Sequence, residues 1–339
     1  MKIGKRFKKN ILILLSDPGC ISIIEYEIND LKKKYNTDIY LLNNYKYKNN
    51  AISKNIISNK IFLKNIRENK YKLILTGTTK KNIELKKLWL KLYDLKYELH
   101  VFIDAIINIE ERFKFKNELL TKIFRKFYVI EEIVKKKLIK LNVHKNNIVK
   151  ISHPLIYNKK IINFKRNKNY KKIIFLSEPI YEYNETKKIG YNQYILINAI
   201  IVFLEKHLNK SITFLIKPHP LEEVKNLKKN ILGLTNKNNK IKIKIVEKPI
   251  QYYYNKVDLC IGMATFGLIE FKFHNPNVLS IQMNRKYDPN PLLKKYKINT
   301  YRNLNYFLKE SIKVVKKIKK LKSINISLKK INKLHNVID

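Results

Sequence analysis

Short runs of apolar residues alternate along this chain with longer stretches in which apolar residues recur every three or four positions. The run Ile11–Leu15, for example, is followed by Ile21–Lys34, where Ile24, Ile28 and Leu31 fall on one helical face. Short apolar runs are typical of buried strands, and the longer spacing is typical of helices packed on a sheet. Their alternation predicts an α/β fold with parallel sheets.

The alternation occurs in two halves of the chain. In the first half we expect helices that include Ile21–Lys34 and Ile83–Leu95, and strands near Ile11–Leu15, Asp38–Leu42, Leu73–Thr76, Val101–Asp104, Phe127–Ile130 and Ile148–Ile151. In the second half we expect helices at Tyr191–His207, Ile250–Asn255, Phe266–Phe273 and Leu304–Ile318, and strands near Ile173–Leu176, Thr213–Ile216, Ile241–Val246, Leu259–Ile261 and Val278–Ile281. At roughly 150 residues per domain, the 339 residues suffice for two domains.

The charged segment 158–172 has no clear periodicity and predicts a linker. We therefore expect two doubly wound, Rossmann-like domains, 1–157 and 173–303, that face each other across a cleft. Ligands of such sheets bind at the carboxyl ends of the strands, so the chemistry is expected in the loops there. Residues 304–339 form a basic helical tail, either a packed terminal helix or an anchor on an anionic membrane surface.

The composition narrows the class of partner. The chain has 72 Lys and Arg against 27 Asp and Glu, a formal net charge of +45, but lysine dominates and is spread over the whole length. Base recognition favours arginine, so we expect a solvated surface that also suits anionic substrates, and no nucleic-acid partner. Two cysteines cannot form a disulfide framework, and Ile11–Leu15 is shorter than the ~7–15 apolar residues of a secretion signal. We expect a cytoplasmic protein, with peripheral contact at the inner membrane face as an alternative.

One candidate anion site follows the strand Thr213–Ile216, in the sequence Lys217-Pro218-His219-Pro220. The two prolines fix the backbone around His219 directly after a buried strand. A solvated histidine at an ordinary strand exit is the alternative. Ser177 and Glu178 follow the strand Ile173–Leu176, and their loop is expected at the same edge of the sheet.

A second candidate lies at Gly262-Met263-Ala264-Thr265, between a buried strand and a helix. Gly262 permits a tight turn, Thr265 is suited to cap the helix, and helix N-termini bind phosphate. The spacing matches neither a P-loop nor a dinucleotide-binding motif. Glu270, on the helix, is either a ligand of ribose hydroxyls or a surface carboxylate.

In the first half, Asp104 ends a predicted strand. A carboxylate there is placed to act as general base on an acceptor hydroxyl, although capping of the next helix is an equally simple role. Two further strand exits, Thr76-Gly77-Thr78-Thr79 and Asp17-Pro18-Gly19, are interpreted as turns. We see no clustered carboxylates near a strand end, and therefore expect no metal site.

Several of these segments together resemble a known family. LIKPHP, CIGMATFGLIEF followed by VLSIQ, and LILTGTT followed by FIDAIINIEERF are similar to GT-B-type proteins of bacterial surface-polysaccharide clusters. Relatives of that family include the bacterial sialyltransferases with an HP motif and, more distantly, the UDP-N-acetylglucosamine 2-epimerases. The similarity extends from about Ile11 to Asn284.

The resemblance implies roles for individual residues. His219 contacts the nucleotide phosphate, Thr265 stands where relatives have a phosphate-binding Ser, and Glu270 stands where they have a ribose-binding Glu. Asp104 matches the aspartate that opens an acidic-acidic-glycine motif, but Ala105 and Ile106 follow it here, which argues against sialyl transfer.

The sequence thus predicts a metal-independent glycosyltransferase without a cofactor. It moves a sugar from a nucleotide-sugar donor to a surface-glycan or lipid-linked acceptor. Asp104 and His219 are the expected catalytic residues. The expected binding residues are Lys217, Pro220, Ser177, Glu178, Gly262, Thr265 and Glu270. The alternatives are a nucleotide-sugar 2-epimerase and a non-catalytic polyanion-binding protein.

Overall fold

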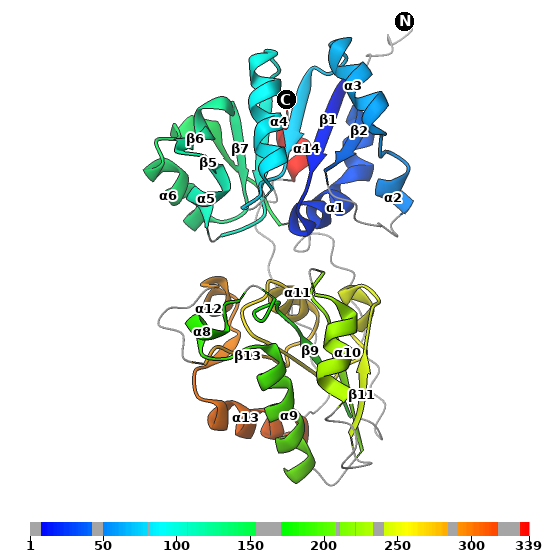
Figure 1. Cartoon of the computed structure of the whole chain (residues 1–339), viewed down its shortest axis with the longest axis vertical. Coiled ribbons are helices and arrows are strands. Elements are labelled where there is room, and N and C mark those ends of the chain that lie inside the picture. Colours follow the sequence, from blue (N-terminus) through cyan, green and yellow to red (C-terminus); the bar gives the residue numbers. More distant parts are fainter. Residues whose placement is uncertain are drawn as a thin grey trace, which may run out of the picture. The chain divides into compact units, whose positions relative to one another are not determined.

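A computed structural model describes residues 8–42, 50–80, 82–106, 108–153, 171–182, 184–207, 211–220, 222–232, 241–283, 290–317 and 333–338. The chain divides into two compact units. Unit 1 comprises Met1–Lys159 and Ser327–Asp339, and unit 2 comprises Lys160–Ile326. Each unit is an α/β structure around one parallel six-stranded sheet (Figure 1).

The sheet of unit 1 has the strand order β2-β1-β3-β4-β7-β8. Its strands are β1 (Lys9–Leu15), β2 (Tyr35–Leu41), β3 (Leu73–Thr76), β4 (Leu99–Ile103), β7 (Lys126–Val129) and β8 (Ile148–Lys150), and β5 (Lys114–Phe115) pairs separately with β6 (Glu118–Leu119). The helices are α1 (Pro18–Lys34), α2 (Asn50–Ser53), α3 (Asn59–Arg67), α4 (Ile83–Asp94), α5 (Ile109–Phe113), α6 (Glu132–Lys140) and α14 (Leu334–Val337), with 3₁₀ turns η1 (Leu120–Ile123) and η2 (Lys145–Asn147).

Successive side chains of β1 point alternately into two apolar cores, one on each face of the sheet. Ile11, Ile13 and Leu15 pack into the core that contains α1. Leu12 and Leu14 point to the opposite core, which contains Trp89 of α4. Successive side chains of a strand point to opposite faces, so a continuous apolar run is buried between two layers of helices.

The sheet of unit 2 has the order β11-β10-β9-β12-β13-β14. Its strands are β9 (Lys171–Leu176), β10 (Ile212–Lys217), β11 (Ile241–Ile245), β12 (Leu259–Gly262), β13 (Val278–Ile281) and β14 (Asn299–Tyr301). The helices are α8 (Thr186–Ile189), α9 (Gln193–His207), α10 (Val224–Leu232), α11 (Gly267–His274), α12 (Leu292–Lys295) and α13 (Leu304–Lys317), with the 3₁₀ turn η3 (Ile250–Tyr253).

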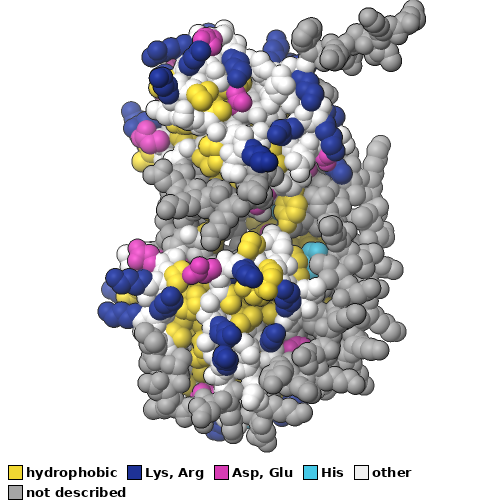
Figure 2. Space-filling view, turned by 90° about the vertical axis from the view of Figure 1, so that its right-hand side faces the viewer, with side chains coloured by type: hydrophobic (Ala, Val, Ile, Leu, Met, Phe, Trp, Pro, Cys, Tyr) yellow, Lys and Arg dark blue, Asp and Glu magenta, His cyan; other side chains and the backbone are white. Residues whose placement is uncertain are grey.

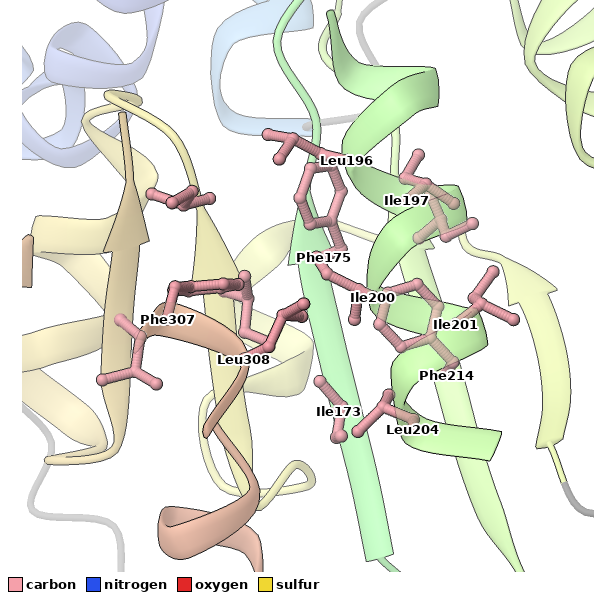
Figure 3. Packing of buried hydrophobic residues seen from close by; sticks show 14 of the residues in the cluster. Ile173, Phe175, Leu196, Ile197, Ile200, Ile201, Leu204, Phe214, Phe307 and Leu308 are labelled. Carbon is pink, nitrogen blue, oxygen red and sulfur yellow. The ribbon is translucent and has the colours of Figure 1, made fainter. Parts of the chain in front are cut away.

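The core of unit 2 joins its sheet to α9 and α13. Phe175 of β9 and Phe214 of β10 lie among apolar side chains of α9, including Ile200, and α13 contributes Phe307 (Figure 3). Burial of each such side chain stabilises the fold by about 1.5–3 kcal/mol. This packing fixes the strands whose carboxyl ends carry the candidate residues of unit 2.

Both sheets reverse their strand order at the first strand of the unit. β1 lies between β2 and β3, and β9 lies between β10 and β12, with all pairs parallel. At such a reversal the flanking loops diverge and leave room for a ligand at the carboxyl ends. The residues after these strands are therefore the first candidates for a ligand site.

Every strand predicted from the apolar runs is present, with ends shifted by a few residues at most. The edge strand β14 escaped the sequence analysis because Asn299-Thr300-Tyr301 is not an apolar run. The helix expected at Ile250–Asn255 is the short 3₁₀ turn η3. Most of the expected linker, 158–172, lies outside the described residues, and its last two residues begin β9.

The predicted tail 304–339 consists of two differently placed parts. α13 belongs to the core of unit 2, whereas α14 packs on α1 in unit 1, with Leu334 and Ile338 fully buried. His335 Nδ1 lies 2.6 Å from Glu27 Oε2. The described parts of the tail are thus packed segments. Among the described residues, no helix combines the length and apolar character needed to cross a membrane.

Candidate functional site

In unit 1, three strand exits converge on the side chain of Arg112. Arg112 Nη1 lies 3.2 Å from Asp104 Oδ1 after β4, 2.9 Å from Thr78 Oγ1 after β3 and 3.9 Å from Asp17 Oδ2 after β1. β1, β3 and β4 are neighbours, so their carboxyl ends lie along one edge. The site is a pair of carboxylates that share one guanidinium.

Asp104 is held on two sides. Its Oδ1 accepts hydrogen bonds from Arg112 and, at 3.4 Å, from Thr78 Oγ1. A Cβ atom on Gly19 would lie 2.1 Å from its Oδ2, so that oxygen packs against the first turn of α1. The alternative role as a helix cap is excluded, because Asn108 is the N-cap residue of α5.

Asp17 precedes α1 as its N-cap residue, yet its side chain makes no capping hydrogen bond. Its Oδ1 accepts a hydrogen bond from Ser16 Oγ at 3.2 Å. Burial and the negative charge of Asp104 raise the pKa of Asp17, while Arg112 acts in the opposite direction. The interpretation of Asp17-Pro18-Gly19 as a plain turn was therefore incomplete.

Lys86 of α4 fixes the backbone on both sides of Arg112. Its buried ammonium donates to the carbonyl oxygens of Glu111 at 2.8 Å and Lys114 at 2.7 Å.

Cys20 of α1 is fully buried, and burial raises the pKa of its thiol well above the ordinary value. A thiol in that state is a packing residue and a poor nucleophile.

In unit 2, the turn after β10 is built around Glu222. The Glu222 carboxylate accepts hydrogen bonds from the backbone N–H of His219 at 2.5 Å, Ser177 Oγ at 2.6 Å and Gln193 Nε2 at 3.0 Å. Burial raises its pKa, and these donors oppose the increase. Glu222 thus joins the exits of β9 and β10 to the first residue of α9.

His219 and Lys217 are only partly exposed. Burial lowers the pKa of His219 to about 4, so the imidazole is neutral at pH 7 and offers one N–H. Burial also lowers the pKa of Lys217, whose Nζ donates to the Glu247 carbonyl oxygen at 3.1 Å. Pro220, the last residue of the motif, is exposed.

The turn after β12 is held from several directions. The backbone N–H of Ala264 donates to the Glu178 carboxylate, and Asn290 Nδ2 donates to the Ala264 carbonyl at 2.9 Å. Thr265 Oγ1 accepts from the Gly267 N–H at 3.3 Å, but Phe266 is the N-cap residue of α11 and no side chain caps the helix, so the expectation that Thr265 caps it was wrong. At Gly262, a Cβ atom would lie 3.2 Å from the Leu176 carbonyl oxygen, so the small residue permits close packing of β12 on β9.

Glu270 is an intermediate case between ligand and surface residue. It is partly exposed, and Tyr254 Oη donates to its Oε2 at 3.0 Å. Burial raises the pKa of Glu270 to about 7. A carboxyl group that titrates near neutrality and already contacts one hydroxyl is suited to accept a hydrogen bond from another.

The structure therefore groups the predicted residues by unit. In unit 2, Lys217 and Gly262 end β10 and β12, and Glu270 lies on α11. The other predicted residues of unit 2 follow β9, β10 or β12: Ser177, Glu178, His219, Pro220 and Thr265. In unit 1, Asp104 follows β4. The sequence analysis missed the Asp17–Arg112 contact and the role of Glu222. Their only local signals were an aspartate after a buried strand and a glutamate three residues after His219. Among the described residues, no three His, Cys, Asp or Glu side chains are grouped as metal ligands.

Comparison with solved structures identifies the fold. The chain is similar to the UDP-GlcNAc 2-epimerase of Methanocaldococcus jannaschii, solved with UDP-GlcNAc and UDP, at a TM-score of 0.59, 15% identity and coverage of 92% of this chain and 94% of that chain. A Rickettsia africae glycosyltransferase is similar at a TM-score of 0.55 and 14% identity, over 92% of this chain and 89% of that chain. Anabaena HepE, solved with UDP-glucose, is similar at a TM-score of 0.55 and 11% identity, over 90% of this chain and 91% of that chain.

The fold is the one shared by GT-B glycosyltransferases and UDP-GlcNAc 2-epimerases, as the motifs predicted. No protein-family model matches the chain, and neither does any curated protein sequence. The specific link to sialyltransferases with an HP motif stays a prediction.

Proposed function

We propose that the protein is a glycosyltransferase that uses a nucleotide sugar as donor. Unit 2 binds the nucleotide, and unit 1 supplies the acceptor side. The observation that carries this proposal is the grouping of a neutral histidine, a threonine hydroxyl at the start of α11 and a half-buried carboxylate after β10 and β12, on either side of β9. These are donors for a phosphate and an acceptor for a ribose hydroxyl in one sheet edge, within a fold whose relatives bind UDP-sugars.

Each residue has a stated task in this proposal. The neutral His219 donates its N–H to a phosphate oxygen, Lys217 adds charge, and Thr265 donates its hydroxyl. Glu270 accepts from a ribose hydroxyl. Because Glu178 already holds the Ala264 N–H and would repel a phosphate, we assign it to hydroxyl groups of the donor.

The reaction needs positioning, a base for the acceptor hydroxyl and stabilisation of the leaving phosphate. We propose that it proceeds without a metal ion. The acceptor is a surface glycan or a lipid-linked glycan, and the net charge of +45 favours an acceptor or a membrane face that is anionic. Lys and Arg side chains are scattered over the face in Figure 2, which suits weak contact with a broad anionic surface.

Thermal unfolding with UDP, CMP, UDP-GlcNAc and heparin tests the proposal. A ligand that binds only the folded state at 100 times its Kd stabilises it by about 2.7 kcal/mol, so the correct nucleotide should raise Tm. His219→Ala should reduce that increase and lower turnover roughly ten- to a hundredfold. The matched control is His207→Ala, since His207 is exposed at the end of α9.

Product analysis separates the alternatives. NMR of the sugar after incubation should show transfer to an added acceptor glycan. A change at C-2 of the free nucleotide sugar would instead identify an epimerase. A Tm increase with heparin and none with any nucleotide at millimolar concentration would identify a polyanion-binding protein and contradict the proposal.

A further inference from the structure

We propose that Asp17, and not Asp104, takes the proton from the acceptor hydroxyl, and that Asp104 is a positioning residue for Asp17 and Arg112. This inference rests on the proposed function and assigns the base within it. The sequence pattern favoured Asp104, because a carboxylate at the end of a strand in the first half is placed to face an acceptor hydroxyl. The geometry of the pair reverses that assignment.

Asp104 has little capacity left for an incoming hydroxyl. Arg112 and Thr78 both donate to its Oδ1 at 3.2 and 3.4 Å, and its Oδ2 packs against Gly19. Its side chain is 12% exposed.

Asp17 is more exposed than Asp104 and lies farther from the guanidinium. It contacts the hydroxyls of Ser16 and Thr79 rather than a close cation. Its side chain is 28% exposed, and the nearest guanidinium nitrogen of Arg112 is 3.9 Å from its Oδ2. Aspartate at an N-cap position normally accepts a hydrogen bond from the helix backbone, but the side chain of Asp17 does not. It is directed to the edge of the sheet, beside Asp104 and Arg112.

Four charged or titratable groups surround Asp17: Asp104 after β4, Arg112 of α5, Cys20 of α1 and Lys86 of α4. Burial and Asp104 raise the pKa of Asp17, whereas Arg112 lowers it. A carboxylate with a raised pKa is a stronger base near neutral pH than an ordinary aspartate. Asp104 therefore contributes through its charge, without touching the acceptor.

Proton transfer to Asp17 accompanies the exchange of one C–O bond for another at the anomeric carbon. The acceptor oxygen forms a bond to the anomeric carbon, and the bond between that carbon and the nucleotide phosphate oxygen breaks. The electron pair of the broken bond leaves with the nucleotide. The acceptor proton moves to Asp17, which becomes a carboxylic acid and then releases the proton to solvent.

The experiment compares kcat, donor KM and nucleotide Kd in Asp17→Asn, Asp104→Asn and the exposed control Asp94→Asn. Asp17→Asn should lower kcat about 10²- to 10⁴-fold, with nucleotide Kd changed less than about twofold. Asp17→Glu, which retains a carboxylate, should recover part of the loss. Because the Asp17 side chain makes no capping hydrogen bond and asparagine has the same size, Tm should change little.

The pH profile distinguishes a base from a positioning residue. In Asp104→Asn the acid limb of kcat should move to lower pH, because the charge that raises the Asp17 pKa is gone. Asp17→Asn should lose that limb. A kcat within about threefold of wild type in Asp17→Asn, together with a large loss in Asp104→Asn, would make Asp104 the base and overturn the inference.

A readout without turnover separates this inference from the proposed function. Carbon-13 NMR of the Asp17 carboxyl should show titration above the ordinary value of 3.8 in wild type and a lower midpoint in Asp104→Asn. The same midpoint in both proteins overturns the inference even if no substrate is found. Failure of every nucleotide to bind contradicts the proposed function, but the titration of Asp17 does not depend on nucleotide binding and is interpreted separately.

Discussion

The acidic groups at the two sheet edges are stabilised in different ways. In unit 1, Asp17 and Asp104 share the guanidinium of Arg112. In unit 2, Glu222 accepts hydrogen bonds from three neutral donors: a hydroxyl, a side-chain amide and a backbone N–H. The first arrangement depends on charge and the second on hydrogen-bond geometry.

The difference shows which edge is suited to proton transfer. At the partly exposed edge of unit 1, burial and the charge of Asp104 raise the pKa of Asp17, so its carboxylate is suited to exchange a proton with a bound hydroxyl. A buried carboxylate with three donors is a brace for the backbone, because each donor would be left unsatisfied without it. We therefore expect substitutions in unit 1 to respond to pH and those in unit 2 to disturb the turn at His219.

The largest decrease in the free energy of unfolding is expected for Arg112→Met. The Arg112 side chain is only 13% exposed, and removing one partner of such a largely buried ion pair leaves uncompensated charge, which costs up to about 3–5 kcal/mol. Without the guanidinium the pKa of Asp17 rises further, so the native state binds more protons than the unfolded state and the free energy of unfolding falls as pH rises above 3.8. Urea unfolding at several pH values measures this slope.

The matched control is Arg125→Met. Arg125 pairs with Glu98, but its side chain is 68% exposed, and such surface pairs contribute less than about 1 kcal/mol. Equal losses in the two variants would mean that the Arg112 cluster is no different from a surface ion pair.

The second largest decrease in the free energy of unfolding, about 2–4 kcal/mol, is expected for Glu222→Ala, because three donors lose their acceptor. His219 should then lose its fixed position, and nucleotide affinity should fall with stability. The adjacent Glu223→Ala serves as control because Glu223 is exposed. Denaturant unfolding and nucleotide titration are the measurements, and an unchanged Glu222→Ala protein would rule out the bracing role.

A smaller effect, about 1–3 kcal/mol, is expected for Gly19→Ala. The new Cβ would overlap Asp104 Oδ2, so Asp104 must move away from the first turn of α1. The substitution changes no ionisable group, and alanine is otherwise favourable in a helix. Turnover should fall while nucleotide binding in unit 2 is retained; loss of both would indicate general misfolding.

The smallest change, about 1 kcal/mol, is expected for Glu270→Gln. In wild type the native carboxyl keeps its proton up to about pH 7, whereas the unfolded chain releases it near 4.5. This group therefore makes the free energy of unfolding decrease between these two pH values and has no further effect above them. Glu270→Gln should flatten the Tm profile over that range, and an identical profile would contradict the raised pKa.

The strands, their alternation with helices and the residues at strand exits could be predicted from the amino-acid sequence. Local hydrophobic runs encode these features, because a buried strand between two helical layers must be apolar on both faces. For this reason the sequence alone indicates Asp104, His219 and Glu178 as candidate residues. The HP motif and the Gly262–Thr265 turn also indicated the fold that the solved structures share.

Tertiary structure alone decided which exits are neighbours. The periodicity of a strand carries no information about its position in the sheet, so nothing local brings Arg112 to both Asp17 and Asp104, or Ser177 to Glu222. The same holds for α14, which packs on α1 although almost the whole chain separates them. The pKa values of Asp17, His219 and Glu270 follow from those contacts and from burial, and so they too depend on the folded state.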